Sequence, residues 1–570
     1  MPPLTRQRTP QSLYSEWSNS YLGATLSIHA LAKPLMKFMY HRAVLNLIKR
    51  QKGVPLSAET MEIYESYLGW KYVTETTKTF ILRELQERAQ AEAEAHIVAN
   101  FLVLYDILLD STSDAIRRWT FWILGKLAGH PSTRGAVVAV RPCARLVTFL
   151  GDSNEDIVEC ACYALSHICA DVDGARAVVE AGVLQIVKQL LESPEAEVRG
   201  WTSWLLAQLA VHPSMRQAVV AVQPCPQLVA LLGDSNGNIV ESACYALSHI
   251  CVNLDGARAI VEAGVLKTAK QLLKSPEAGV RRWTSWLFAE LAVHPSMRQA
   301  VVAIQPCPQL VALLGDSNKD VVESVCYALS HICADLNGAR AVVKAGMLET
   351  LKQLLKSPAA QVRKRTSWLL SELAGHSATR QAVVAVQPCS QLVALLGDSN
   401  EDVVKGSCSA LFYICVDLDG ARAVVKAGVL ETAKQLLKSP DAEIHKCTSW
   451  LLARLAVHPS TRQAVVAVQL CTQLAALLGD SNEDVVKGGC SALFHICVDL
   501  DGARAVVKAG ALETVKQLLK SAEVGVRKRT CWLLARLAGH SSTRGAVVAV
   551  RPCARLVALL RDSNEDVVQG

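Results

Sequence analysis

Three features are scarce or missing in this sequence of 570 residues. Aromatic residues make up only 5%, and basic side chains outnumber acidic ones by only seven. No apolar run reaches the roughly 18 residues that a membrane-spanning helix needs, and the start, MPPLTRQRTP, has no apolar signal core and no glycine after Met1. These absences argue against a transmembrane segment, a secretory leader and N-myristoylation, and the low net charge gives no reason to expect DNA as a partner.

Signatures of catalysis are missing as well. The sequence has no P-loop, no Rossmann glycine pattern and no H-E-x-x-H. Residues 233–237, GDSNG, match the G-x-S-x-G nucleophile elbow, but a leucine-rich helical segment precedes them where that motif needs a strand. We therefore expect neither an enzyme nor a cofactor. Nineteen cysteines without a secretory signal favour reduced thiols in the cytoplasm or the nucleus.

What the sequence does have is a strict internal repeat. Its most regular markers are six tryptophans, each 82 residues after the one before: Trp122, Trp204, Trp286, Trp368, Trp450 and Trp532. The GDSN turns and a set of histidines, from His130 to His540, follow the same step. A fixed period of this kind indicates stacked structural modules.

Each 82-residue double repeat divides into two related halves, as in 173–212 and 213–253. Both halves predict a short helix, a second helix with leucines at 3–4 spacing, and a longer third helix. We expect Ser193 to cap one third helix and a capping box at Ser153–Asp156 to begin the other. Gly182 is expected to end a first helix in the left-handed conformation.

The pattern AG-V-L-x-x-x-K-Q-L-L-K-S followed by V-R-x-x-T-x-W-L-L-x-x-L-A resembles the armadillo repeat. The resemblance implies an all-α, right-handed solenoid over residues 91–570, with about eleven three-helix repeats and a truncated twelfth. Residues 1–90 are expected to form a helical N-terminal cap. The chain is similar to the large armadillo-repeat proteins of fungi, and more distantly to solenoids of the importin-alpha and vacuolar protein 8 types.

The last repeat stops where its third helix should begin, leaving the segment ARLVALLRD with an uncovered apolar flank. Solenoids normally cover their ends with a polar capping repeat. We expect a monomer, with end-to-end association through this uncapped C-terminus as the alternative.

The recurring motif CYALSHIC at 162–169 suggests a metal site at first sight. On one helix, however, Cys162 and Cys169 lie about 10 Å apart along the axis, and His167 points elsewhere. Zinc–sulfur bonds of about 2.3 Å do not bridge that gap. The cysteines are therefore predicted to be small core residues, with a metal site between neighbouring repeats as the minor alternative.

The armadillo resemblance implies that third helices line a concave surface. Importins-alpha carry a W-x-x-x-N spacing there, in which Trp forms stacked walls and Asn binds the backbone of an extended peptide. This sequence keeps the spacing but has no Asn at that position. The candidate groove residues are Trp122, Lys126, Tyr163, His167, Trp204, Gln208, Tyr245, His249, Trp286, Glu290, Tyr327, His331, Trp368, Glu372, Lys405, Trp450, Arg454, Lys487, Trp532 and Arg536. The alternative is that the tryptophans only pack neighbouring third helices together.

Charge along this expected surface changes near residue 350. The earlier part is aromatic and mildly acidic, with Glu241, Glu290 and Glu323. The later part carries basic residues: Lys364, Arg365, Lys405, Lys446, Arg454, Lys487, Lys528, Arg529 and Arg536. This pattern predicts a protein scaffold whose groove binds an extended or disordered partner segment, with acidic residues over 360–540. A transport adaptor similar to importin-alpha, and RNA or phospholipid binding through the later half, are the alternatives.

Overall fold

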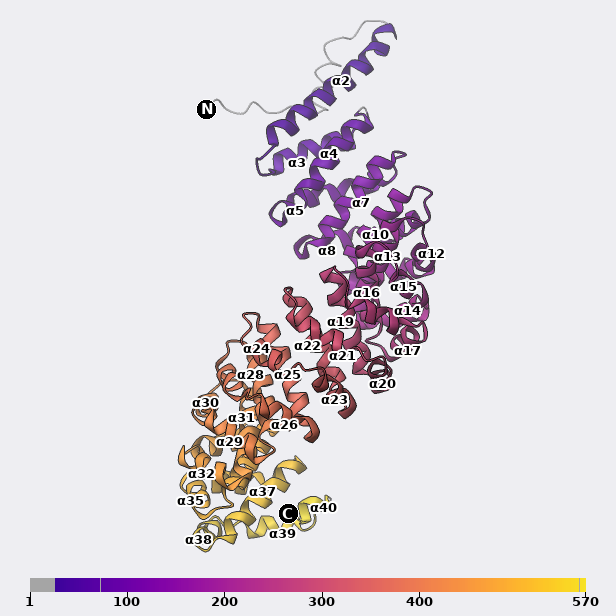
Figure 1. Ribbon diagram of the computed structural model, residues 1–570. Coiled ribbons are helices and arrows are strands. Elements are labelled where there is room, and N and C mark those ends of the chain that lie inside the picture. The colour runs from indigo at the N-terminus through magenta and orange to yellow at the C-terminus, as the bar shows by residue number, and fades with distance from the viewer. Residues whose placement is uncertain (1–25, 72, 563, 570) are drawn as a thin grey trace. The chain divides into compact units, whose positions relative to one another are not determined.

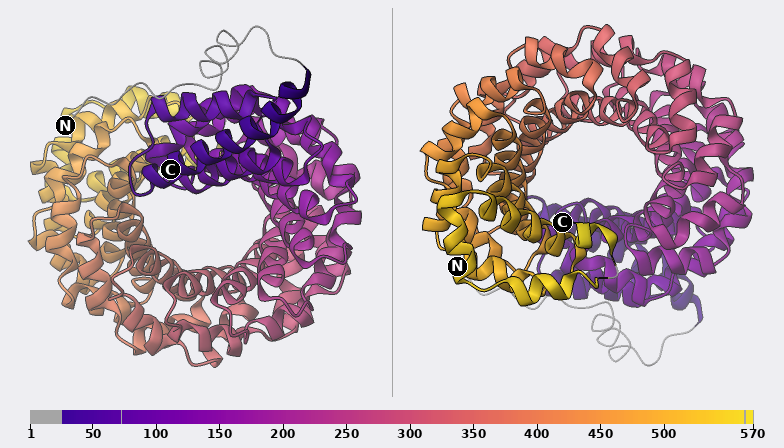
Figure 2. Two further views of the ribbon diagram at one scale, coloured as in Figure 1. Left: turned by 90° about the horizontal axis from the view of Figure 1, so that it is seen from above. Right: turned by 90° about the horizontal axis from the view of Figure 1, so that it is seen from below.

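The computed structural model describes residues 26–71, 73–562 and 564–569, and all regular structure within them is helical. By its contacts the chain divides into an N-terminal unit, Met1–Ala269, and a C-terminal unit, Lys270–Gly570. Within each unit the helices follow one another in chain order (Figures 1 and 2). Each unit is therefore an all-α solenoid.

The longer third helices form a continuous row in each unit, because each one packs against the next. In the N-terminal unit they are α4 (Glu75–Arg88), α7 (Asp114–Gly129), α10 (Glu155–Ile168), α13 (Ala196–Val211) and α16 (Gly237–Ile250). In the C-terminal unit they are α19 (Ala278–Val293), α22 (Lys319–Ile332), α25 (Ala360–Gly375), α28 (Glu401–Ile414), α31 (Ala442–Val457), α34 (Glu483–Ile496) and α37 (Val524–Gly539).

The first helices of the repeats are about nine residues long. They are α8 (Pro131–Ala139), α11 (Val172–Glu180), α14 (Pro213–Ala221), α17 (Leu254–Glu262), α20 (Pro295–Ala303), α23 (Leu336–Lys344), α26 (Ser377–Ala385), α29 (Leu418–Lys426), α32 (Pro459–Ala467), α35 (Leu500–Lys508) and α38 (Ser541–Ala549).

The second helices are shorter still, and several end in a single 3-10 turn. They are α9 (Cys143–Thr148), α12 (Val187–Leu191), α15 (Cys225–Leu231), α18 (Val265–Leu272), α21 (Cys307–Ala312), α24 (Leu348–Leu354), α27 (Cys389–Ala394), α30 (Val429–Leu436), α33 (Cys471–Ala476), α36 (Ala511–Leu518) and α39 (Cys553–Leu559).

The first part of the described chain is also helical. It contains α2 (Leu26–Gln51), α3 (Ala58–Gly69), α5 (Glu92–Val98) and α6 (Tyr105–Leu109). The third-helix row begins within it, since α4 packs against α7. At the other end of the chain, α40 (Glu565–Gln569) follows α39, and Leu560 is 63% exposed.

The predicted capping pattern is partly wrong. Gly182 does adopt the left-handed conformation after α11, with φ of +88°. The cap of α10 is Asn154, whose side chain accepts the Asp156 N–H, so the box expected from Ser153 does not form. Ser193 accepts the Glu195 N–H in the turn before α13. Side chains of Asn and Ser both bind a backbone N–H two residues ahead, so sequence alone misplaces the cap by one or two positions.

The repeated histidines at the ends of third helices connect neighbouring repeats. His212 Nε2 lies 2.8 Å from the Cys169 carbonyl oxygen, and His376 Nε2 lies 2.8 Å from that of Cys333. Each hydrogen bond satisfies a carbonyl at the end of a preceding third helix, where no backbone donor is available. Along the described chain, no helix combines the length and the apolar character needed to cross a membrane.

Candidate functional site

The regular spacing of the tryptophans places them between successive third helices. In the N-terminal unit, the ring centroids of Trp122 and Tyr163 are 4.1 Å apart, and Tyr163 lies 4.9 Å from Trp201. Tyr163 is only 4% exposed, so it fills the space between two indoles. Trp204 and Tyr245 repeat the same pairing at 4.7 Å. Here the ladder is mainly a packing device.

In the C-terminal unit the same positions are more open. Trp286 still packs on Tyr327, with ring centroids 4.8 Å apart. Trp368 and Trp532, however, are 37% and 39% exposed. The tryptophans thus pack against neighbouring third helices and, in the later repeats, also present a ring edge to solvent.

The ladder histidines are half-buried, neutral packing partners. His167, His249 and His331 each meet the tyrosine four residues earlier edge-on, with ring centroids 4.6, 4.8 and 4.6 Å apart. Burial, with help from nearby basic side chains, lowers the pKa of each of these imidazoles to about 4. They are uncharged near neutral pH.

Two of the residues that stand four positions after a tryptophan, Lys126 and Glu290, contact a tyrosine of the ladder. The Lys126 ammonium lies 5.8 Å from the centre of the Tyr163 ring. Tyr327 donates a hydrogen bond to Glu290, with a distance of 3.4 Å. Burial raises the pKa of Glu372, and Gln208 is half-buried. This position therefore varies in charge from one repeat to the next while staying at least partly buried in Gln208, Glu290 and Glu372.

The expected basic lysines prove to be paired within the protein. Lys405 Nζ lies 3.1 Å from the Asp441 carboxylate, and Lys487 Nζ lies 2.8 Å from that of Glu523. Lys446 is paired with Glu443. The lysine part of the predicted gradient is thus largely neutralised, because the next third helix begins with an acidic residue opposite each of the two ladder lysines.

Three arginines of the predicted basic set are not neutralised in this way. Among the described residues, no carboxylate lies within ion-pair distance of Arg454, Arg529 or Arg536. Each guanidinium instead lies over an aromatic ring: Arg454 over Phe412 at 4.7 Å, Arg529 over Trp450 at 5.3 Å and Arg536 over Phe494 at 4.9 Å. Stacking of this kind leaves in-plane N–H groups available to an anion. In Arg529 these are the N–H groups that are not already donated to Ser491 Oγ and to the Gly525 carbonyl.

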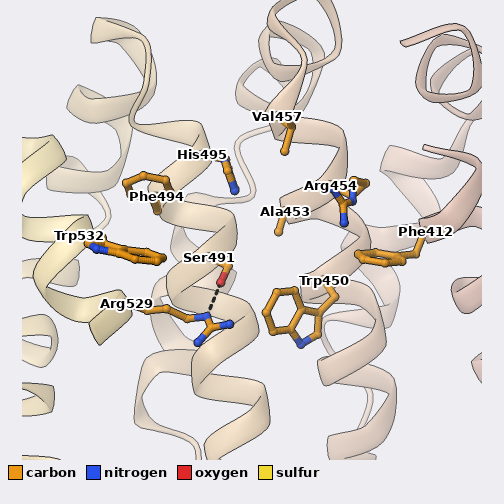
Figure 3. Close-up of a pocket in the computed structure, with 10 residues that line it drawn as sticks. All are labelled: Phe412, Trp450, Ala453, Arg454, Val457, Ser491, Phe494, His495, Arg529 and Trp532. Carbon is orange, nitrogen blue, oxygen red and sulfur yellow. Dashed lines mark hydrogen bonds between the residues drawn. The ribbon is translucent and has the colours of Figure 1, made fainter. Parts of the chain in front are cut away.

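A hollow of about 240 Å³ is lined by two of these arginines, Arg454 and Arg529. Its lining comes from α28, α31, α34 and α37: Phe412, Trp450, Ala453, Arg454, Val457, Ser491, Phe494, His495, Arg529 and Trp532. In Figure 3, Ser491 lies between the two indoles, and Arg529 Nε donates to Ser491 Oγ at 3.0 Å. Burial and the neighbouring arginines lower the pKa of His495, which adds no charge near neutral pH. The hollow combines aromatic walls with free cations.

Sequence reasoning missed Phe412 and Phe494. They stand where the earlier repeats have Ser166, Ser248 and Ser330, so the motif ALSHI becomes ALFYI and ALFHI. In the same helices the ladder tyrosine becomes serine. This paired exchange was visible in the sequence, but its meaning depends on which helices the two positions face.

The recurring cysteines belong to the core. Cys162 and Cys169 are 0% exposed, and burial raises the pKa of the Cys162 thiol to about 12. In the part of the chain that the structure describes, no three His, Cys, Asp or Glu side chains gather as a metal site would need.

Comparisons with known proteins agree with this architecture. No family model matches the chain. Importin subunit alpha-8 of Arabidopsis thaliana is 25% identical over 349 residues, which cover 59% of this chain and 75% of that protein. Importin subunit alpha-1a of Oryza sativa subsp. japonica is 26% identical over 240 residues, and the match covers 40% of this chain and 45% of that protein. The chain thus spans less than half the length of that rice protein.

Two further likenesses cover more of the chain. Human junction plakoglobin is 20% identical over 475 residues, which cover 77% of this chain and 62% of that protein. The crystal structure of an engineered protein superposes with a TM-score of 0.63 at 27% identity, covering 69% of this chain and 98% of that one. Together with the rows of three-helix repeats in both units, these likenesses show that the chain is an armadillo-repeat protein.

Proposed function

We propose that this protein is a non-enzymatic scaffold that binds an extended segment of a partner polypeptide along its third helices. Acidic residues of that segment lie on the C-terminal unit. The observation that carries the proposal is the set of three stacked arginines, Arg454, Arg529 and Arg536, without carboxylate partners among the described residues.

The chemistry of this surface suits a peptide. The exposed indole edges of Trp368 and Trp532 offer apolar contact, while the guanidinium groups offer charge-assisted hydrogen bonds to carboxylates. A solenoid presents such groups at regular spacing, and a flexible chain can follow them. The nineteen free thiols suit a reducing compartment, so we place this function in the cytoplasm or the nucleus.

The test is selection of random 16-residue peptides displayed on phage, with the full-length protein as bait. Peptides that bind are then synthesised with a fluorescent label and measured by anisotropy. We expect the selected sequences to be rich in Asp and Glu. Replacing Arg454, Arg529 and Arg536 together by Gln should weaken their binding by at least about tenfold, since each charged contact contributes about 1.5–3 kcal/mol.

The matched control is a variant with Lys405, Lys446 and Lys487 replaced by Gln. These lysines are already paired, so we expect a smaller loss of affinity than in the arginine variant. Equal affinity of the selected peptides for the wild type and the arginine variant would contradict the proposal.

The same measurements separate the two alternative functions. A transport adaptor similar to the importin-alpha relatives should select basic peptides, which the uncompensated arginines disfavour. Binding of a single-stranded RNA oligonucleotide or of anionic vesicles, with affinity falling steeply as salt rises, would favour a nucleic-acid or phospholipid partner instead.

A further inference from the structure

The C-terminal unit contains an internal template for what the hollow binds. Two double repeats separate Trp286, Tyr327 and Arg365 from Trp450, Ser491 and Arg529, so the two triads occupy equivalent positions. In the earlier triad the Arg365 guanidinium lies 4.1 Å from the Tyr327 ring centre and 5.9 Å from that of Trp286. Tyrosine there is held between an indole and a cation.

The later triad keeps the indole and the cation but lacks the ring between them. Arg529 still lies over Trp450, at 5.3 Å, and the hollow opens beside Ser491. The neighbouring residue Ala453 is small, as are its equivalents Ala207 and Ala289 beside the tyrosine-bearing helices. The walls that accept a tyrosine ring in the earlier repeats are therefore present here.

A second exchange removes the carboxylate partner of the arginine. Arg365 Nε lies 3.6 Å from the Glu323 carboxylate, whereas the residue equivalent to Glu323 beside Arg529 is Lys487. That lysine turns to Glu523, at 2.8 Å. Arg529 consequently lacks both a tyrosine ring and a carboxylate like those that Arg365 contacts in Tyr327 and Glu323.

We propose that the hollow beside Ser491 binds an aromatic side chain of an acidic partner peptide. The partner's ring takes the place that Tyr327 fills, and an adjacent partner carboxylate takes the role of Glu323. This inference rests on the proposed function, because it specifies one side-chain site on the same peptide-binding surface. The ring gains burial of apolar surface and a cation–π contact.

The test uses labelled 12-residue peptides rich in Glu and Ser, with Phe, Leu or Ala at the centre and Glu beside it. For the full-length wild type we expect the Phe peptide to bind at least about tenfold more tightly than the Ala peptide, and more tightly than the Leu peptide. Equal affinity for Phe and Ala, or for Phe and Leu, would overturn the proposal. If no peptide of the set binds, the proposed function fails together with this inference.

The decisive variant is Ser491→Tyr. It places in the hollow the same kind of ring that Tyr327 supplies at the equivalent position of the earlier triad. We expect it to bind the Ala peptide as the wild type does and to lose the preference for Phe, so that the affinity ratio falls to about one. Circular dichroism and thermal unfolding verify its fold. A preference retained in a folded Ser491→Tyr protein would contradict the site.

Two further variants serve as a control and as an independent test. Ser409→Tyr makes the same exchange one double repeat earlier, where Cys447 replaces the arginine, and should leave the Phe preference unchanged. Arg529→Gln leaves the hollow unfilled and removes the cation, so it should reduce the Phe-to-Ala ratio without relying on a new buried ring. An unchanged ratio in Arg529→Gln would also count against the proposal.

Discussion

At the scale of single residues, one arginine position near the start of a third helix shows how a single side chain joins two neighbouring repeats. Arg281 Nε binds Asp316 at 2.8 Å, while its Nη1 donates to the Ser275 carbonyl at 2.9 Å. The equivalent residue in a later repeat is His445, whose Nδ1 is 3.8 Å from the Asp480 carboxylate. Both its ring nitrogens are buried without a hydrogen-bond partner.

We therefore predict that His445→Arg stabilises the protein by about 1–2 kcal/mol, because arginine restores the charge-assisted hydrogen bonds to Asp480 and to the preceding turn. Urea unfolding followed by circular dichroism measures the change. The reciprocal variant Arg363→His should be destabilising, since Arg363 binds Asp398 at 2.7 Å. A lower unfolding midpoint for His445→Arg would show that the site does not accept the longer side chain.

The buried histidines make stability depend on pH in a defined window. The pKa of His167, His249 and His331 is about 4 in the folded protein, against about 6.5 for an unburied imidazole. Below pH 6.5 the unfolded chain takes up protons that the folded chain does not, so stability is highest above pH 6.5 and declines as pH falls towards 4. We expect the urea midpoint to fall over this range.

A variant that cannot titrate tests the cause. His331→Gln should make the pH dependence between 6.5 and 4 shallower, with His167 and His249 accounting for the slope that remains, whatever its effect on stability at pH 7. Carboxylates such as Asp316 and Asp398 have pKa values lowered by their arginine partners, so their contribution to the pH dependence falls mainly in the acidic part of this window and below it. An unchanged slope would show that other groups are responsible.

At the scale of the elements, the sequence motif D/N-G-A-R fixes how a first helix leaves the preceding third helix. A Cβ atom placed on Gly338 would lie 1.8 Å from the Ile332 carbonyl oxygen, and the equivalent glycine of each other double repeat makes a similarly close approach. Only a residue without a side chain lets the two backbones meet at this distance.

Gly338→Ala should therefore destabilise the protein by about 3 kcal/mol or more, since the clash is with backbone and cannot be relieved by a rotamer change. Gly346→Ala is the control, because that glycine has φ of +82° but open space around it. Its cost should be about 1 kcal/mol, from the left-handed conformation alone. Thermal unfolding of both variants measures the difference, and equal losses would refute the argument.

At the scale of the whole molecule, each described unit is a chain of near neighbours. The third helices pack one to the next, and the hydrogen bonds between repeats join residues about 35 to 43 positions apart. Stability in such an array is roughly a sum over repeats and their interfaces. We therefore expect that one 82-residue double repeat can be deleted while the remaining repeats stay folded.

We predict that deleting residues 320–401, which joins Lys319 to Asp402 in register, leaves a folded protein. Mean residue ellipticity at 222 nm should stay unchanged, and the urea m-value should fall roughly in proportion to the lost surface. The hollow around Ser491 lies beyond the deletion, so the preference for Phe peptides should survive it. A large loss of ellipticity per residue would show that the repeats are not interchangeable.

The sequence by itself determined the fold class of this protein. The tryptophan period, the apolar spacing and Gly182 predicted three-helix repeats, because helix formation and repeat packing are decided by neighbours close along the chain. It also predicted the buried cysteines, since Cys162 and Cys169 fall on the apolar face of one helix.

Only the tertiary structure decided which charges are free and where the surface opens. Lys405 and Lys487 looked like Arg454 and Arg529 in the sequence, yet the lysines meet carboxylates on the next third helix and the arginines do not. Likewise, the serine at position 491 leaves a hollow only because Trp450 and Arg529, from the neighbouring third helices, line the space beside it. Both outcomes depend on side chains about 36 to 41 residues away, whose proximity comes from repeat stacking and not from any local pattern.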